Sequence, residues 1–185
     1  PYGDERIGKQ VYIDILNRAR KYVHIMTPYL ILDDEMITAL RYCAKRGVET
    51  VIIMPHIPDK IYAYLLARTY YKQLLKYGVT IFQVTKSYYP QLLKHGVKIY
   101  EYTPGFVHAK VFVSDDIRGC VGTINLDFRS LYLHFECGAY MYSNDVLHDV
   151  EQDFKETLKQ CQEITKESCD KYPKGKMLVG KMLRL

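Results

Sequence analysis

The chain has 185 residues, of which 48% are hydrophobic and 25% are charged, a globular composition that is long enough to bury one core. Its formal net charge of +5 and pI of about 8.8 favour an anionic substrate or surface, but they are too low for a dedicated nucleic-acid-binding protein, and no nucleic-acid partner is expected. Five cysteines without zinc-ligand spacing, no apolar run of about 18 residues and no signal-peptide layout predict reduced thiols, no metal site and a soluble or membrane-peripheral chain.

The first part of the chain alternates helical and strand patterns. Apolar side chains recur at four-residue steps over residues 5–20, which predicts an amphipathic helix, and residues 22–27 are typical of a strand. A second helix is expected from the acidic cap at Asp33 to Gly47, because carboxylates suit the positive end of a helix dipole. Residues 48–54 are then predicted to form a buried strand.

Two similar units follow, at residues 69–82 and 87–100. They are offset by 18 residues and are identical at nine of 14 positions. Each unit predicts a short helix, a stop at a glycine and a strand. We interpret the pair as a local duplication, and the repeat itself indicates no function.

From residue 106 the pattern changes to strands around tight turns. Strands are expected at 106–113, 120–124 and 135–142, followed by a helix that begins near Asn144 and carries apolar residues at three- and four-residue spacing, namely Leu147, Val150, Phe154, Leu158 and Cys161. Strands that alternate with helices predict an α/β fold with a mixed β-sheet flanked by helices. Residues 1–170 are expected to form this domain, and residues 171–185 a separate tail.

The stretch from His108 to Asp115 indicates chemistry. Side chains two apart on a strand share a face, so His108 and Lys110 are expected to point into the same space while Ala109 and Val111 face the core. An imidazole beside an ammonium suits a phosphodiester, because imidazole can attack phosphorus or move a proton near neutral pH and the ammonium neutralises the nonbridging oxygens.

Two further residues complete this candidate site. Asn125 can donate a hydrogen bond to the phosphate oxygens, and a carboxylate behind the imidazole would fix its tautomer. Glu136 is the candidate for that carboxylate. Asp127 and Arg129 either contact a headgroup or order the loop that follows Asn125.

The spacing of these residues resembles the phospholipase D superfamily. The signature His-x-Lys-x4-Asp followed by Gly-Thr-x-Asn is matched by His108, Lys110, Asp115, Gly122, Thr123 and Asn125, and Glu136 lies 28 residues past His108, where smaller members place the acid that orients the histidine. The resemblance implies a phospholipase D-like αβα half-domain that needs no metal or other cofactor. It also implies that His108 is a nucleophile or general acid, that Lys110 and Asn125 bind phosphate, that Thr123 lies in the same phosphate-binding stretch, and that Asp115 is more structural than chemical.

The flanking segments are similar to the bacterial cardiolipin synthase family, over roughly residues 6–165. They are Thr27 to Glu35, Ser87 to Pro90, Gly96 to Lys110 and Asn125 to Glu136. That family joins two phosphatidylglycerol molecules into cardiolipin and releases glycerol through a phosphohistidine, with two such motifs in one polypeptide. This chain has one motif and looks like the C-terminal half, so its expected partner is an N-terminal half or a second copy of itself.

Several alternatives stay open at this point. Transfer to a lipid hydroxyl is the leading interpretation, with a phospholipase D or a phosphatidylserine synthase-type enzyme as the runner-up. In a different class, the isolated half binds without turnover. The resemblance implies a cytoplasmic catalytic domain at the cell membrane, with anionic phospholipid as a partner. The tail at 171–185 holds five basic and no acidic residues among apolar ones, which is typical of a membrane-interfacial segment, a frayed tail or a docking helix.

Overall fold

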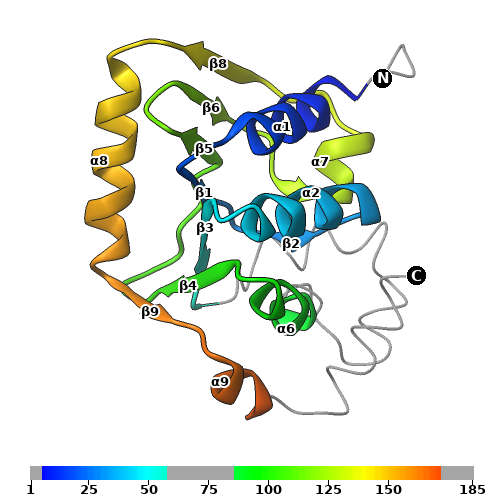
Figure 1. The fold of residues 1–185 in the computed structure, drawn as a ribbon, viewed down its shortest axis with the longest axis vertical. Coiled ribbons are helices and arrows are strands. Elements are labelled where there is room, and N and C mark those ends of the chain that lie inside the picture. The colour runs from blue at the N-terminus through cyan, green and yellow to red at the C-terminus, as the bar shows by residue number, and fades with distance from the viewer. Residues whose placement is uncertain (1–5, 58–85, 172–185) are drawn as a thin grey trace.

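The computed structural model of the protein describes residues 6–57 and 86–171. Figure 1 shows the elements of these two ranges. The helices are α1 (Ile7–Arg18), α2 (Asp34–Lys45), α6 (Tyr89–Lys94), α7 (Phe128–Tyr132), α8 (Val146–Leu158) and α9 (Lys166–Asp170). The strands are β1 (Tyr22–Met26), β2 (Leu30–Ile31), β3 (Glu49–Pro55), β4 (Lys98–Tyr102), β5 (Val111–Ser114), β6 (Arg118–Gly122), β7 (Leu126–Asp127), β8 (Gly138–Tyr142) and β9 (Cys161–Glu163).

The main sheet is mixed. Its strands lie in the order β8-β6-β5-β1-β3-β4-β9, with β1, β3 and β4 parallel and the other neighbouring pairs antiparallel. Figure 1 shows α8 on one face of the sheet and α1, α2 and α6 on the other. The predicted α/β fold with a mixed sheet flanked by helices is therefore confirmed.

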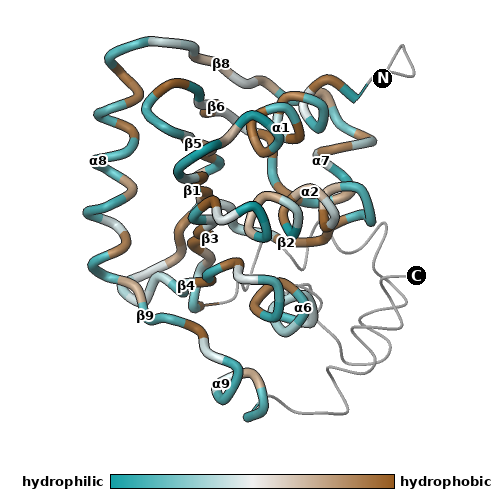
Figure 2. The backbone as a smooth tube through the Cα atoms, in the orientation of Figure 1, coloured by the Kyte–Doolittle hydropathy of each residue, from teal (hydrophilic) through white to brown (hydrophobic). Residues whose placement is uncertain are grey.

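The central strands are apolar because helices cover both of their faces. Six of the seven residues of β3 are buried, and the last four of the five in β1. Figure 2 shows this as a brown band through β1 and β3 at the middle of the molecule. A strand that is buried on both sides needs a continuous apolar run rather than an alternating one.

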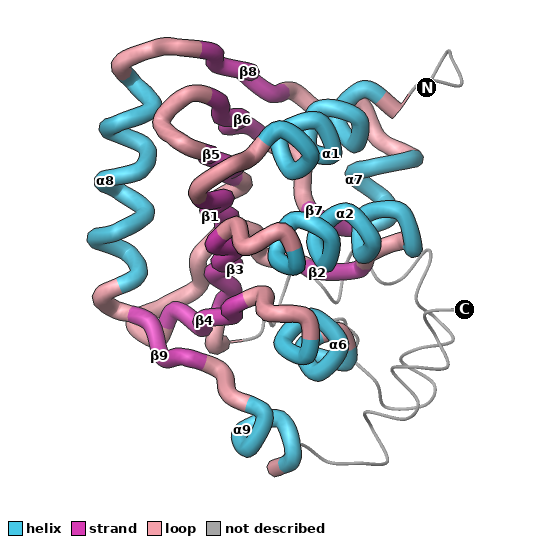
Figure 3. The backbone as a smooth tube through the Cα atoms, in the orientation of Figure 1, coloured by secondary structure: helices cyan, strands magenta, loops and turns pink. Residues whose placement is uncertain are grey.

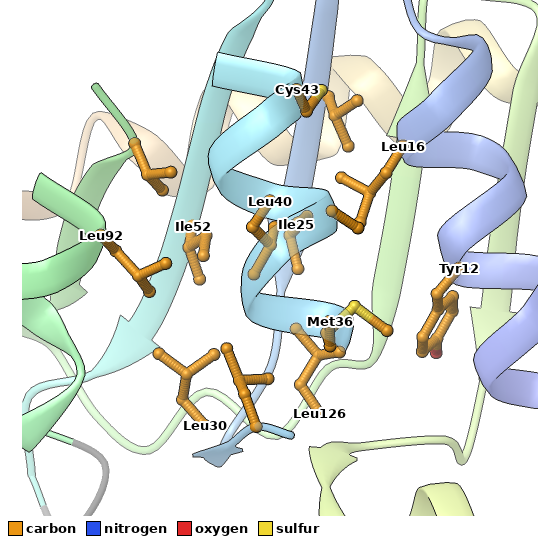
Figure 4. Packing of buried hydrophobic residues seen from close by; sticks show 14 of the residues in the cluster. Tyr12, Leu16, Ile25, Leu30, Met36, Leu40, Cys43, Ile52, Leu92 and Leu126 are labelled. Carbon is orange, nitrogen blue, oxygen red and sulfur yellow. The ribbon is translucent and has the colours of Figure 1, made fainter. Parts of the chain in front are cut away.

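The larger core lies between the sheet and the helices α1, α2 and α6. Figure 4 shows Leu16 of α1 and Leu40 of α2 beside Ile25 of β1 and Ile52 of β3, all fully buried. The helix α2 begins where the acidic cap predicts, because the Asp33 carboxylate accepts a hydrogen bond from the Met36 amide at 2.8 Å.

The opposite face of the sheet is covered by α8. Phe154 is fully buried there and stacks on the His24 ring with the ring centroids 4.5 Å apart. The same imidazole lies with its Nδ1 2.8 Å from a carboxylate oxygen of Glu151, which is also on α8. One aromatic contact and one buried polar contact therefore hold α8 against β1.

Several predicted boundaries are wrong in the second half of the chain. The strand expected at 106–113 begins only at Val111, because its neighbour β1 ends at Met26, the residue that pairs with Val111. The strands expected at 120–124 and 135–142 are β6 and β8, which pair with each other over 118–122 and 138–142. The last helix stops at Leu158, and Cys161 instead begins β9, which pairs with β4.

The second of the two similar units forms the elements that were predicted for it. It folds as α6, a turn at Gly96 with φ of 89°, and β4. A positive φ of this size favours glycine, which explains the stop. The first unit at 69–82 and the tail from residue 172 onward lie outside the described residues. Figure 3 shows the helices, strands and loops of the residues that are described.

One edge of the sheet collects the polar sequence motifs. The parallel strands β1, β3 and β4 end at this edge, and β5 begins there because it runs antiparallel to β1. The segments that leave β1 and β6 at this edge form the two-stranded sheet of β2 and β7, in which Leu30 pairs with Leu126. The segments that carry His108, Lys110 and Asn125 are brought together at the carboxyl ends of parallel strands, where α/β folds place ligand sites.

Candidate active site

His108 and Lys110 lie in the extended segment that leads into β5. The His108 side chain is exposed, whereas Lys110 is only 8% exposed. The Lys110 Nζ lies 2.8 Å from His108 Nδ1 and 3.0 Å from Nε2, and it donates to the His108 carbonyl oxygen at 2.6 Å. The structure thus places an imidazole and an ammonium in direct contact, with the imidazole on the solvent side.

The ammonium of Lys110 is held in an environment of opposing effects. Burial lowers its pKa, and the charges of Glu136 and Asp127 act in the opposite direction. Both carboxylates are therefore within electrostatic range of Nζ. An anionic phosphate that entered beside His108 would add a further favourable charge for the ammonium.

Glu136, just before β8, is held by contacts with Thr123, the residue that follows β6. The Thr123 hydroxyl donates to the Glu136 carboxylate. The Thr123 backbone amide donates to the Cys137 carbonyl at 2.8 Å, and the Cys137 amide donates to the Thr123 hydroxyl oxygen at 3.0 Å. This arrangement fixes the carboxylate at the end of β6 and β8.

Close backbone packing explains why the motif Gly-Thr-x-Asn begins with glycine. A Cβ at Gly122 would lie 2.1 Å from the Cys137 carbonyl oxygen and 2.6 Å from the Gly138 Cα. No side chain fits where these two backbones approach so closely. Glycine at 122 lets the Thr123 and Glu136 segments come together.

Asn125 lies between β6 and β7, directly before Leu126. Its Nδ2 donates to the Ser130 hydroxyl oxygen at 3.1 Å, and its Oδ1 is buried without a hydrogen-bond partner among the described residues. The reverse orientation of the amide would let Ser130 donate to the oxygen and would direct the NH2 group to the position without a partner. That orientation is the one an anionic oxygen would favour.

Asp127 orders the same loop. It is 7% exposed, and its carboxylate accepts a hydrogen bond from the Ser130 amide at 2.8 Å as the N-cap of α7. Burial raises its pKa, and the nearby charge of Glu136 acts in the same direction. Of the two roles considered for Asp127, the geometry shows the ordering of the loop.

Asp115 lies at the far end of β5 from Lys110. Its carboxylate accepts three backbone hydrogen bonds, from Arg20 at 2.8 Å and from Lys21 and Tyr22 at 2.9 Å each. Its own φ is 57°, in the left-handed region. The aspartate of the signature therefore fastens the turn after β5 to the beginning of β1, and it does not contact the imidazole.

A cavity of about 320 Å³ with both apolar and polar lining lies beside Glu136, and Arg6 and His134 are among its polar residues. Glu136 is on its wall, whereas His108 and Lys110 are not. Apolar side chains from α1, α7 and the segments around β6 and β8 make up much of the lining, among them Ile7, Val11, Ile124, Leu131, Phe135 and Tyr140. This cavity can hold an apolar group next to the polar residues.

Two residues that support the site were not predicted. Tyr12 of α1 donates to the Ile124 carbonyl at 2.7 Å and stacks on Phe112, and the Thr27 hydroxyl oxygen accepts from the Leu126 amide at 3.2 Å. Both hold the segment that carries Asn125. Thr27 is the first residue of one of the segments that resemble cardiolipin synthase, and nothing else in the sequence pointed to it. Tyr12 is not among the apolar residues at four-residue steps that predicted α1.

Several known proteins are similar to this chain. A family model described as the phospholipase D-like domain of cardiolipin synthase matches residues 12–158. The chain is 36% identical over 156 residues to cardiolipin synthase 2 of Bacillus anthracis and 37% identical over 171 residues to cardiolipin synthase of Clostridium perfringens strain SM101, which cover 84% and 92% of this chain. It spans only 27% and 32% of those two proteins.

Solved structures share the fold at low sequence identity. The phospholipase D family member Nuc of Salmonella typhimurium has a TM-score of 0.63 at 14% identity, covering 85% of this chain and 91% of that one. Phosphatidylserine synthase of Haemophilus influenzae has a TM-score of 0.63 at 18% identity, covering 96% of this chain and 42% of that one. Over the described residues, none of the helices has the length and apolar character needed to cross a bilayer. With the family model covering most of its length, the chain belongs to the phospholipase D superfamily, in the family of cardiolipin synthase phospholipase D-like domains.

Proposed function

We propose that the full-length protein carrying this chain transfers a phosphatidyl group between phospholipids, making cardiolipin from two phosphatidylglycerol molecules and releasing glycerol. The observation that carries the proposal is the contact between His108 and the buried Lys110, with the charges of Glu136 and Asp127 within electrostatic range. The two cardiolipin synthases described above, which share more than a third of their aligned residues with this chain, favour this acceptor.

The proposed reaction needs two imidazoles. One attacks phosphorus, so that a phosphorus–nitrogen bond forms as the bond from phosphorus to the departing glycerol oxygen breaks, and the other gives that oxygen a proton. In the second step the proton donor takes a proton from the acceptor hydroxyl, whose oxygen attacks phosphorus while the phosphorus–nitrogen bond breaks. By family analogy His108 is the proton donor, Lys110 and Asn125 hold the phosphate oxygens, and Glu136 orients His108.

The second imidazole must come from another motif, either an N-terminal half or a second copy of this chain. The face beside Glu136 suits such a partner. Phe135 is 77% exposed, Leu133 and Tyr140 are also exposed, and β8 is an edge strand of the sheet. Exposed apolar side chains along an unpaired edge are typical of an interaction surface.

The substrate would be presented at a membrane surface, with the catalytic domain on the cytoplasmic side of the cell membrane. The basic and apolar composition of residues 171–185 supports contact with anionic phospholipid. The apolar side chains of the cavity beside Glu136 are compatible with a lipid substrate. No nucleic-acid partner is proposed.

Two other functions differ from this one in testable ways. A phospholipase D or a phosphatidylserine synthase-type enzyme would use the same site with water or serine as the acceptor. A half-domain without a partner would bind lipid and turn nothing over. The likeness to phosphatidylserine synthase is at the level of the fold, so the choice of acceptor depends on an assay.

The test is product analysis with radiolabelled phosphatidylglycerol in mixed micelles. Cardiolipin and glycerol in equal amounts are expected from the full-length protein, and none from the His108→Ala variant. The exposed His148, which lies near Asp116 at the opposite end of the sheet, provides the control, since His148→Ala should retain transfer. Phosphatidic acid as the sole product would reject the synthase assignment.

A further inference from the structure

A second polar cluster contains His56, Glu101 and Lys86. His56 follows β3, Glu101 is on β4, and Lys86 precedes α6. The His56 Nδ1 is 2.8 Å from one oxygen of Glu101, and the Lys86 Nζ is 3.0 Å from the other. The Glu101 side chain is 1% exposed, that of Lys86 is 12% exposed and that of His56 is 45% exposed. Only the imidazole of this cluster offers a substantial surface to solvent.

The register of the sheet places this cluster at the same edge as Lys110. Val111 pairs with Met26 and Met26 with Ile53, so Lys110 is level with Met54, whose partner on β4 is Glu101. At a strand spacing of about 4.8 Å and a rise of about 3.3 Å per residue, the Cα of His56, two residues past Met54, lies roughly 12 Å from that of Lys110, and the Cα of Glu101 lies roughly 14 Å from it.

Both clusters also lie on one face of the sheet. Phe112 and Ile99 belong to the core under α1, α2 and α6. Side chains two apart on a strand share a face, so Lys110 lies on the face of Phe112, and Glu101 lies on the face of Ile99. The His56 amide donates to the Tyr102 carbonyl at 3.0 Å, which extends the pairing of β3 with β4 to His56. His56, Glu101 and Lys110 therefore lie on the same face at the same end of the sheet.

The charges of the cluster indicate which ligand His56 would take. Lys86 and Glu101 form an ion pair, and the other oxygen of Glu101 faces the His56 Nδ1. Because a carboxylate only accepts hydrogen bonds, the proton of the neutral ring must be on Nδ1, and Nε2 then carries a lone pair. A neutral Nε2 accepts a hydrogen bond from an alcohol and cannot donate one to a phosphate.

We propose that His56, oriented by Glu101 and Lys86, binds a hydroxyl of the acceptor alcohol and holds that alcohol in position for transfer at His108. This inference rests on the proposed transfer reaction, and it adds a binding site for the second substrate. The ligand class is a diol of the glycerol type, which either free glycerol or the headgroup of phosphatidylglycerol supplies. His56 is a binding residue here and takes no part in the making or breaking of bonds at phosphorus.

Direct binding tests the site without any turnover. In the protein labelled with ¹⁵N-histidine, glycerol should shift the His56 Nε2 resonance and leave that of His148 unchanged, because His148 lies near Asp116 at the opposite edge. Phosphatidylglycerol micelles should produce the same shift if the lipid headgroup is the source. Micelles of phosphatidic acid, which lacks the glycerol hydroxyls, and inorganic phosphate should not. A shift with phosphate but not with glycerol, or no shift at all, would overturn the assignment.

Partitioning between transfer and hydrolysis tests the role in the reaction. The His56→Leu variant should raise the KM for glycerol about fivefold, the effect of one lost neutral hydrogen bond, while hydrolysis without glycerol stays within twofold of wild type. His56→Gln, which keeps a hydrogen-bonding amide, should lose less, and His148→Leu should lose nothing. An unchanged KM for glycerol in His56→Leu would refute the inference and leave the proposed function standing. If the full-length protein showed no turnover that depends on His108, the proposed function would be refuted instead. The binding measurement would still test whether His56 binds glycerol.

Discussion

Among the residues of the signature, Asp115 is the one whose role the structure describes as purely structural, and this can be tested. Its carboxylate accepts three backbone hydrogen bonds of 2.8 to 2.9 Å, and its φ is 57°. Two of those three bonds are exposed to solvent, so we assign about 1 kcal/mol to each bond rather than the larger values of buried charged pairs, which gives about 3 kcal/mol for the set. Alanine in the left-handed region adds about 1 kcal/mol more. Asp115→Ala should therefore lower the free energy of unfolding by about 4 kcal/mol.

Asp116 is a matched control for this change. It has the same φ of 57°, and its carboxylate accepts one exposed hydrogen bond, from the Tyr22 hydroxyl at 2.7 Å. Asp116→Ala should cost about 2 kcal/mol, from the same backbone strain and a single side-chain bond. The difference of about 2 kcal/mol between the two variants then measures the anchoring of β1 by Asp115.

Urea denaturation followed by circular dichroism gives both values. The Asp115→Asn variant should fall between wild type and Asp115→Ala, since asparagine tolerates the left-handed region and its amide oxygen can still accept. At a temperature where each variant is folded, all three should retain transfer within about threefold, because Asp115 is remote from phosphorus. A loss of activity with unchanged stability would show that Asp115 acts chemically and would refute this reasoning.

Three further predictions concern the site and the α8 face. Burial lowers the pKa of Lys110 in the folded state, so the unfolded chain binds that proton more tightly. Lys110→Met should therefore abolish transfer but unfold at a higher urea concentration than wild type at pH 7. This gain in stability should shrink as the pH is raised to about 9.5, because the wild-type lysine then loses its proton in the folded state. A larger advantage at the higher pH would contradict the burial argument. Thr123→Val should lower transfer about tenfold because Glu136 loses its hydroxyl donor, whereas Thr123→Ser should stay near wild type; equal rates in steady-state assays would dismiss that contact. Phe154→Ala, at a fully buried side chain, should cost about 3 to 5 kcal/mol in urea denaturation, and a cost below about 1 kcal/mol would mean that α8 does not pack as described.

The sequence predicts the regular part of the fold because its patterns are local. The acidic cap at Asp33, the stop at Gly96 and the apolar run of β3 each follow from the preferences of a few neighbouring residues, and each is found in the structure. The start predicted for the strand at residue 106 was wrong because a strand ends where its partner ends, and the partner residue of Val111, Met26 on β1, is 85 residues earlier in the chain. The short pair of β2 and β7 also depends on a distant partner and left no periodic signal.

The candidate site divides in the same way. The proximity of His108 and Lys110 follows from two-residue spacing alone, and the structure shows it at 2.8 Å. The contacts of Asn125 with Ser130 and of Thr123 with Glu136 depend on how the loop after β6 folds back, which no spacing rule gives. The cluster of His56 with Glu101 joins residues 45 positions apart, so it becomes visible only when β3 and β4 lie side by side.

The claim on which the rest depends is that His108 handles the phosphodiester. The most direct measurement is mass spectrometry of the lipids formed from phosphatidylglycerol by the full-length protein and by its His108→Ala and His148→Ala variants, each shown to be folded by circular dichroism. Cardiolipin should accumulate with wild type and with His148→Ala, and it should be absent with His108→Ala. Cardiolipin at the wild-type rate from folded His108→Ala would contradict the account.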